Sequence, residues 1–192
     1  MENPYWHPTI KPHAFDPDSV SEQCLKCFEP LSTSSSLGVF WESASEDEGL
    51  EESIWSYPTL VKLHQQCAEL KLSSALLFLA ISFRTLDDQR REDEGFREFV
   101  KNLETSFSNL HFYQGNGKTT LREACNKIVH ATDVRPVYDN GSDRIEREVW
   151  GMDGQLELKG SLGGTNWAVN LNMFDFLEAL LDVVQYVNDE IK

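Results

Sequence analysis

The chain has 192 residues, of which 40% are hydrophobic and 11% aromatic, which is enough to form the core of one domain. Its 17 Lys and Arg residues are outnumbered by 32 Asp and Glu residues, so the formal net charge is −15 and the pI is near 4.6. A field of that sign repels phosphate backbones, and the composition therefore disfavours non-specific binding to DNA or RNA. It suits a basic protein partner, or mimicry of nucleic acid if carboxylates line one face.

Residues 1–57 read as an irregular N-terminal arm. Prolines interrupt this arm at five positions, a Ser-rich segment covers residues 31–38, and an acidic run covers residues 45–52. Its many aromatic residues predict that the arm wraps on the body of the protein. We expect residues 31–53 to be the most mobile internal segment, because their Ser and acidic side chains bury too little apolar area to offset the cost of ordering.

Residues 58–192 are predicted to form a single helical domain with an inserted β-meander. The apolar positions recur with the helical period and predict helices over residues 58–70, 73–88, 94–107 and 119–131. Residues 75–81 are apolar all round, which predicts that the second of these helices is the buried centre of the bundle.

The period then changes from that of a helix to that of a strand. Strands are predicted over residues 144–150, 155–161 and 165–171, with turns at Asp153-Gly154 and Gly163-Gly164. The side chains predicted to face the helices are those of Leu156, Leu158, Trp167, Val169 and Leu171. Asn172 is predicted to cap a last helix over residues 173–188.

The predicted fold class is therefore α+β. It combines a bundle of about five helices with a three-stranded antiparallel meander over residues 144–171, placed before the C-terminal helix, and with the irregular N-terminal arm.

The first residues give no indication of export. Residues 1–7 contain neither the basic start nor the apolar run of a signal peptide. The longest apolar stretch, residues 75–83, is too short to span a bilayer. We therefore expect a cytoplasmic protein that has reduced thiols and does not associate with a membrane.

Cys24 and Cys27 form a CxxC pair, and His7 and His13 precede it. These four residues are a weak zinc candidate, because a strong zinc signal pairs the CxxC with a second close pair of ligands. We therefore expect no metal and no other cofactor, and we interpret the two cysteines as reduced thiols in the arm.

The helix predicted over residues 119–131 carries the residues of this chain that are best suited to catalysis. Arg122, Asn126 and His130 lie four residues apart on its polar side. A histidine can transfer protons and a guanidinium can stabilise negative charge, so this arrangement suits cleavage of a nucleic acid. Surface helices also acquire such a pattern without any function.

Residues 126–130, Asn-Lys-Ile-Val-His, resemble the motif helix of HEPN-type domains. In that family an Arg is followed by a polar residue, often Asn, then by three residues and a His. The resemblance implies a helical bundle in which two motif helices meet across a dimer and cleave RNA without a metal.

Asn126 and His130 match this motif, but Cys125 stands where the family has Arg. Arg122, one turn earlier, or Arg84, on a neighbouring helix, could supply the guanidinium instead. The resemblance covers residues 58–131, and the predicted strands lie outside its usual pattern. Residues 121–131 also resemble helices of bacterial and phage proteins of unassigned activity, which implies a bacterial or mobile-element lineage.

The leading hypothesis is a non-catalytic interaction or regulatory protein of bacterial, phage or defence-related origin, because acidity and an incomplete catalytic set both favour it. The first alternative is a HEPN-like metal-independent ribonuclease or RNA-binding toxin that uses His130, Asn126, Arg122 and Arg84. The second alternative is an acidic inhibitor that mimics nucleic acid. The expected partner is a protein, including a second copy of the chain, with RNA as the alternative.

A structural interpretation of the same polar residues stands beside these hypotheses. His130 would then lie in solvent at the helix C-terminus, where the dipole favours positive charge. Alternatively, Asn126 and His130 would pair with Arg84 or Asp88 and fix the helix register.

Overall fold

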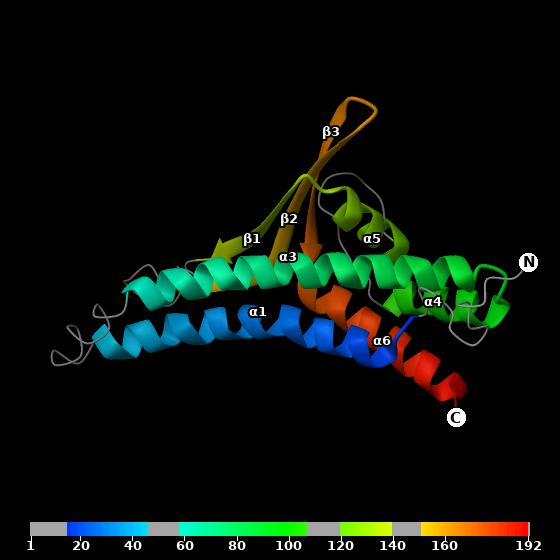
Figure 1. Ribbon diagram of the computed structural model, residues 1–192, viewed down its shortest axis with the longest axis horizontal. Helices are drawn as coiled ribbons and strands as arrows, with labels where there is room; N and C mark the ends of the chain where they lie inside the picture. The colour runs from blue at the N-terminus through cyan, green and yellow to red at the C-terminus, as the bar shows by residue number, and fades with distance from the viewer. Residues whose placement is uncertain (1–14, 46–57, 107–119, 140–150, 192) are drawn as a thin grey trace, which may run out of the picture.

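The computed structural model describes residues 15–45, 58–106, 120–139 and 151–191 (Figure 1). These residues form five helices and one three-stranded sheet, and the sheet precedes the last helix. The elements in chain order are α1 (Pro17–Ser45), α3 (Pro58–Gln89), α4 (Glu94–Ser106), α5 (Leu121–His130), β1 (Asp133–Asp139), β2 (Gly151–Leu162), β3 (Thr165–Asn172) and α6 (Met173–Ile191). The predicted α+β class, with its antiparallel meander before the C-terminal helix, is confirmed.

Helix α1 replaces most of the irregular arm that we predicted from the sequence. Pro17 occupies the first turn, where its missing N–H costs nothing, and the backbone N–H of Asp18 donates to Asp16 Oδ1 at 3.3 Å. The buried side chains then recur with spacings of four, three and four residues: Val20, Cys24, Cys27 and Leu31. The prediction was wrong for residues 17–45 because the prolines and serines obscured this pattern. Residues 1–14 and 46–57 of the arm, including residues 46–53 of its expected mobile segment, lie outside the described residues.

Residues 58–89 form one helix, α3, where two helices were predicted with a break near residue 71. No Gly or Pro lies between residues 59 and 89 to end the first helix. The hydroxyl of Ser74 donates to the carbonyl of Lys71 at 3.1 Å, so it remains satisfied inside the helix.

The prediction that α3 is buried all round was also wrong. Leu76, Leu79 and Phe83 are at most 1% exposed, but Leu77 and Ile81 on the opposite side are 44% and 50% exposed. By length and composition alone, the segment Gln66–Gln89, which is 24 residues long, could cross a membrane: its apolar window of 18 residues has a mean hydropathy of 1.3, and 39% of that window is buried. Helices that are buried inside proteins pass the same test, so this finding is weak evidence for a membrane span.

The strand order is β1-β2-β3, and both pairs are antiparallel. Gly163 and Gly164 have φ values of 57° and 83°, as a two-residue hairpin turn requires, and Leu162 pairs with Thr165 across it. Four of the side chains predicted to face the helices are buried, namely Leu156, Leu158, Val169 and Leu171, and Trp167 is half-buried against the core.

The Asp153-Gly154 dipeptide does not separate two strands as predicted, because it lies inside β2. The register with β1 shifts at this point, Gly154 has a φ of 88°, and the N–H of Gln155 donates to Asp153 Oδ1 at 2.7 Å. The dipeptide thus makes a bulge in a continuing strand. The strand that pairs with it is β1, and the strand predicted over residues 144–150 lies outside the described residues.

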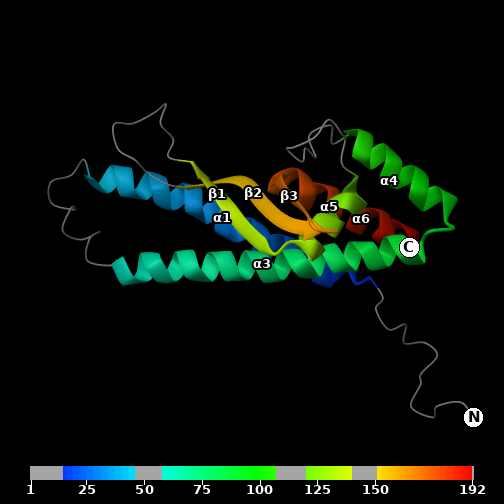
Figure 2. The same cartoon turned by 90° about the horizontal axis from the view of Figure 1, so that it is seen from above.

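Helices α1 and α3 lie side by side along the long axis of the molecule, and the sheet and α5 lie against them (Figures 1 and 2). The N-cap predicted for α6 is confirmed, since Asn172 Oδ1 accepts from the N–H of Phe174 at 3.0 Å. One continuous hydrophobic core joins residues from all five helices with residues from β2 and β3. Helix α1 is therefore an integral part of the domain.

Candidate functional site on helix α5

The N-terminal end of α5 is fixed by side chains from two places in the chain. Thr120 is the N-cap, and its hydroxyl accepts from the N–H of Glu123 at 3.1 Å. Glu104, on α4, accepts from the N–H of Leu121 at 2.8 Å. The apolar side of the helix, formed by Leu121, Ala124, Cys125 and Ile128, is buried in the core. The polar side therefore carries Arg122, Asn126 and His130, as the periodicity predicted.

Arg122 is occupied by two carboxylates of α3. Its Nη1 donates to Asp87, and its Nη2 donates to Asp88 Oδ1 at 2.7 Å. These bonds raise the pKa of the guanidinium above its ordinary value. Because both bonds cross from α5 to α3, the positive charge of Arg122 stabilises the packing of the two helices.

Asn126 is bonded within its own helix. Its Nδ2 donates to Glu123 Oε2 at 3.2 Å, and Lys127 Nζ lies 3.5 Å from the other oxygen of the same carboxylate. The ammonium of Lys127 also lies 4.5 Å from the ring centroid of Trp167 on β3. The polar face of α5 is therefore tied to the sheet at one end and to α3 at the other.

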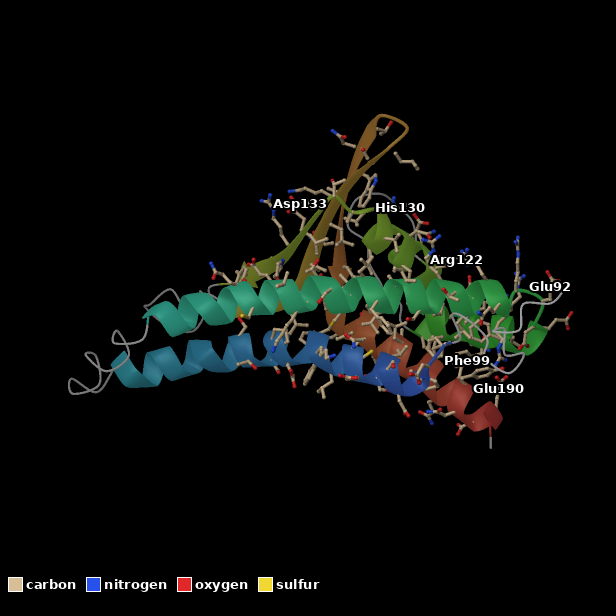
Figure 3. All side chains as sticks on the ribbon, viewed as in Figure 1. Glu92, Phe99, Arg122, His130, Asp133 and Glu190 are labelled. Atoms are coloured by element: carbon tan, nitrogen blue, oxygen red, sulfur yellow. The ribbon has the colours of Figure 1, made fainter. Side chains whose placement is uncertain are left out.

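His130 is the last residue of α5 and is exposed. Figure 3 shows it at the end of α5 beside the sheet, whereas Arg122 lies near the other end of the helix. A histidine at this position meets the partial negative charge of the last carbonyls. The geometry agrees with the structural interpretation for His130, while Asp88 pairs with Arg122 instead of with Asn126 or His130.

Arg84, the other guanidinium that the sequence offers, interacts electrostatically with Cys125 of α5. It comes from α3 and is half-buried, and its Nε is buried without a hydrogen-bond partner. Its charge acts on the thiol of Cys125, which is fully buried and whose pKa is raised by that burial. The structure thus brings Arg84 toward the centre of α5 from a neighbouring helix.

A cavity of about 750 Å³ opens where the end of α3, α4 and the start of α5 meet. Its walls carry four basic and four acidic side chains together with Val100 and Thr120: Arg91, Arg97, Lys101, Arg122, Asp87, Asp88, Glu98 and Glu104. Burial raises the pKa of Glu104 above its ordinary value. Sequence reasoning missed this cavity, because its walls come from three helices. Of the predicted site residues, only Arg122 lines it.

The weak zinc candidate does not form a metal centre among the described residues. Cys24 and Cys27 face the core of the protein from α1, and burial raises the pKa of each thiol to about 12. Metal binding requires the thiolate, which this environment disfavours. His7 and His13 lie outside the described residues, and the residues that are described contain no group of three or more His, Cys, Asp or Glu able to hold a metal ion.

Comparison of the chain with protein-family models, with curated proteins and with solved structures finds no match in any of the three. The resemblance to HEPN-type domains therefore rests on Asn126 and His130 and on the helical setting of α5.

Proposed function

We propose that this protein is a non-catalytic interaction protein that binds another protein through exposed apolar surface. The observation that carries this proposal is the grouping of large apolar side chains on two parts of the helical surface. The first group, here called the α3 outer face, comprises Cys67, Leu70, Ser74, Leu77, Phe78 and Ile81. The second group, here called the α1/α6 patch, comprises Leu25, Phe28, Phe174 and Leu181.

The α1/α6 patch is held together by an aromatic contact between its two helices. The rings of Phe28 and Phe174 lie edge to face with centroids 6.4 Å apart, and yet the residues are 47% and 44% exposed. Single exposed apolar residues are ordinary on a protein surface, but a contiguous group is typical of a binding site.

The state of the polar residues on α5 also supports a non-catalytic role. A catalytic guanidinium must be free to meet charge that develops in the transition state. Arg122 already binds Asp87 and Asp88, and Asn126 binds Glu123. These groups stabilise the protein itself.

The test is affinity capture of partners with wild-type protein and with matched variants. We expect a partner that wild type retains to be lost with Leu25→Glu or Leu77→Glu and kept with His130→Ala. The two leucines are exposed, so neither change should unfold the protein. Retention of every partner by both apolar variants would contradict the proposal.

The HEPN-like ribonuclease remains the second candidate, favoured by the exposure of His130 and by the approach of Arg84 to Cys125. In that case His130→Ala and Asn126→Ala should abolish RNA binding or cleavage while the melting temperature stays near that of wild type. Binding should also weaken steeply with salt, as contact with phosphate requires. If the same variants unfold the protein, these residues are structural.

Mimicry of nucleic acid receives less support from the spacing of charges. Asp175, Glu178 and Asp182 lie on one side of α6, at intervals of three and four residues. At the helical rise these intervals are roughly 5 Å, whereas each strand of duplex DNA carries one charge per roughly 3.4 Å of its axis. The carboxylate row of α6 is thus sparser along its axis than the phosphates of one strand, and it gives mimicry only weak support.

A further inference from the structure

We propose that the α3 outer face is a self-association surface, on which the α3 helix of a second copy of this chain packs. This inference rests on the proposed interaction role and names one partner for it.

The spacing of residues on the outer face is the first argument. Cys67, Leu70, Ser74, Leu77 and Ile81 follow one another at intervals of three, four, three and four residues. An average of 3.5 residues is the repeat that keeps one side of a helix facing a second helix along its whole length. Helix α1 buries residues at the same intervals inside the protein.

The position of the outer face is the second argument. Leu70 is 73% exposed and Phe78 is 41% exposed, although the opposite side of the same turns is in the core. In Figure 2, α3 runs along one edge of the described part of the molecule, and only the first turns of α1 show beyond it. A second helix can therefore approach along this edge.

The area of the face sets the strength of the expected association. Its four large apolar side chains expose on the order of 400 Å² in total, which lies in the range of roughly 300–600 Å² of the largest apolar patch on a typical monomer, a patch that is often functional. A standard interface buries roughly 800 Å² on each partner. We therefore expect a reversible dimer with a dissociation constant on the order of micromolar.

Charge is the argument for a second copy. The whole chain carries −15, but residues 67–85 of α3 contain only Glu69, Lys71 and Arg84 as charged residues. Two copies repel each other over most of their acidic surface, and the nearly neutral outer face is where they can approach. A membrane surface fits less well, because helices that lie on anionic lipid are rich in Lys and Arg on their polar side.

The experiment measures mass by analytical ultracentrifugation over a concentration series of the full chain. We expect wild type to shift from monomer to dimer, and Leu70→Glu and Leu77→Glu to weaken association roughly tenfold or more. Leu25→Glu is the matched control, since Leu25 is also an exposed leucine on a helix, at 54%. Circular dichroism checks that each variant is folded.

The single exposed cysteine gives an independent measurement. Of the four cysteines, Cys24, Cys27 and Cys125 are buried, and Cys67 on the outer face is exposed. Its rate of reaction with a maleimide should fall as the concentration of wild type rises through the dimer range. In Leu77→Glu the rate should not depend on concentration.

Three results would overturn the inference: a wild type that stays monomeric at all concentrations, dissociation of the dimer by Leu25→Glu alone, or a Cys67 labelling rate that is the same in monomer and dimer. None of these decides the proposed function. A monomer that still loses a captured partner through Leu25→Glu would remain an interaction protein that uses the α1/α6 patch.

Discussion

Replacement of Gly160 by Ala tests the contact between the sheet and the end of α5. A Cβ atom added at Gly160 would lie 2.2 Å from Trp167 Cζ2 and 2.8 Å from the carbonyl oxygen of His130. Ordinary contacts between carbon atoms are roughly 3.5–4.0 Å, so both neighbours must move. The indole ring can swing aside, but the His130 oxygen belongs to the backbone and moves only with the last turn of α5.

The magnitude follows from three contributions. Forcing a methyl group into a packed site costs about 1–3 kcal/mol. Displacing Trp167 also weakens its contact with Lys127, which is worth about 0.5–1 kcal/mol. The change restricts the unfolded chain, which returns about 0.4–1 kcal/mol. We therefore expect Gly160→Ala to lower the free energy of unfolding by about 1–3 kcal/mol.

The assay is equilibrium unfolding in urea, with Gly95→Ala as the control. At Gly95 the nearest atoms to an added Cβ are 3.5 Å away, and Gly95 lies in the first turn of α4, so the same chemical change should stabilise the protein by about 0.4–1 kcal/mol. A Gly160→Ala protein as stable as wild type would refute this packing of β2 against α5.

Three further predictions follow from burial and charge. Leu79→Ala and Leu180→Ala should each lower the free energy of unfolding by about 2–5 kcal/mol, because both side chains are 0% exposed; a loss below about 1 kcal/mol in urea unfolding would contradict their place in the core. Arg122→Ala should cost about 1 kcal/mol, as its two ion pairs are partly exposed, whereas Arg135→Ala, whose side chain is 67% exposed, should cost less; equal costs in the same assay would argue against a structural role for Arg122. Burial raises the folded-state pKa of Glu104, so the contribution of this group to stability is fully present below its ordinary pKa of 4.5 and is lost as the pH rises through the folded value. The Glu104→Gln variant should lack that loss. Identical pH profiles of unfolding for the variant and wild type would contradict the raised pKa of Glu104.

Features that depend on local chemistry could be predicted from the sequence. Gly163-Gly164 turns the hairpin because its backbone needs two positive φ angles, and Asn172 caps α6 because its side chain reaches the first free N–H groups. The Asp153-Gly154 pair shows the limit of such a signal. Its side-chain bond and positive φ are those of a turn, but pairing on both sides converts the turn into a bulge.

Helix α1 could not be recognised because its local signals contradict its packing. Pro30 removes one hydrogen bond from the middle of the helix, and the serines near residue 34 favour loops. The buried residues outweigh these costs, and Ser34 itself is used, since its Oγ accepts from the N–H of Met152 in β2 at 2.9 Å. That partner lies far away in the sequence and only the fold reveals it.

Only part of the candidate site could be predicted from the sequence, because its contacts also join residues that are far apart in the chain. The period of α5 places Arg122, Asn126 and His130 on one side of the helix, but it cannot say what they bind. The carboxylates that hold Arg122 lie on α3, more than thirty residues earlier in the chain. Polar residues on one helix suggest a catalytic site when the residues that bind them from other helices are unknown.

Helix α3 explains why one apolar sequence admits three interpretations. A core helix, a membrane span and an interface helix share the same composition, and only the distribution of buried side chains separates them. A core helix should be buried all round, but Leu77 and Ile81 are 44% and 50% exposed. A span needs roughly 20 consecutive predominantly apolar residues, but only residues 72–83 lie between the charged side chains of Lys71 and Arg84. Helix α3 has one buried face and one exposed apolar face with the spacing of a helix pair, and this is why we propose it as an interface.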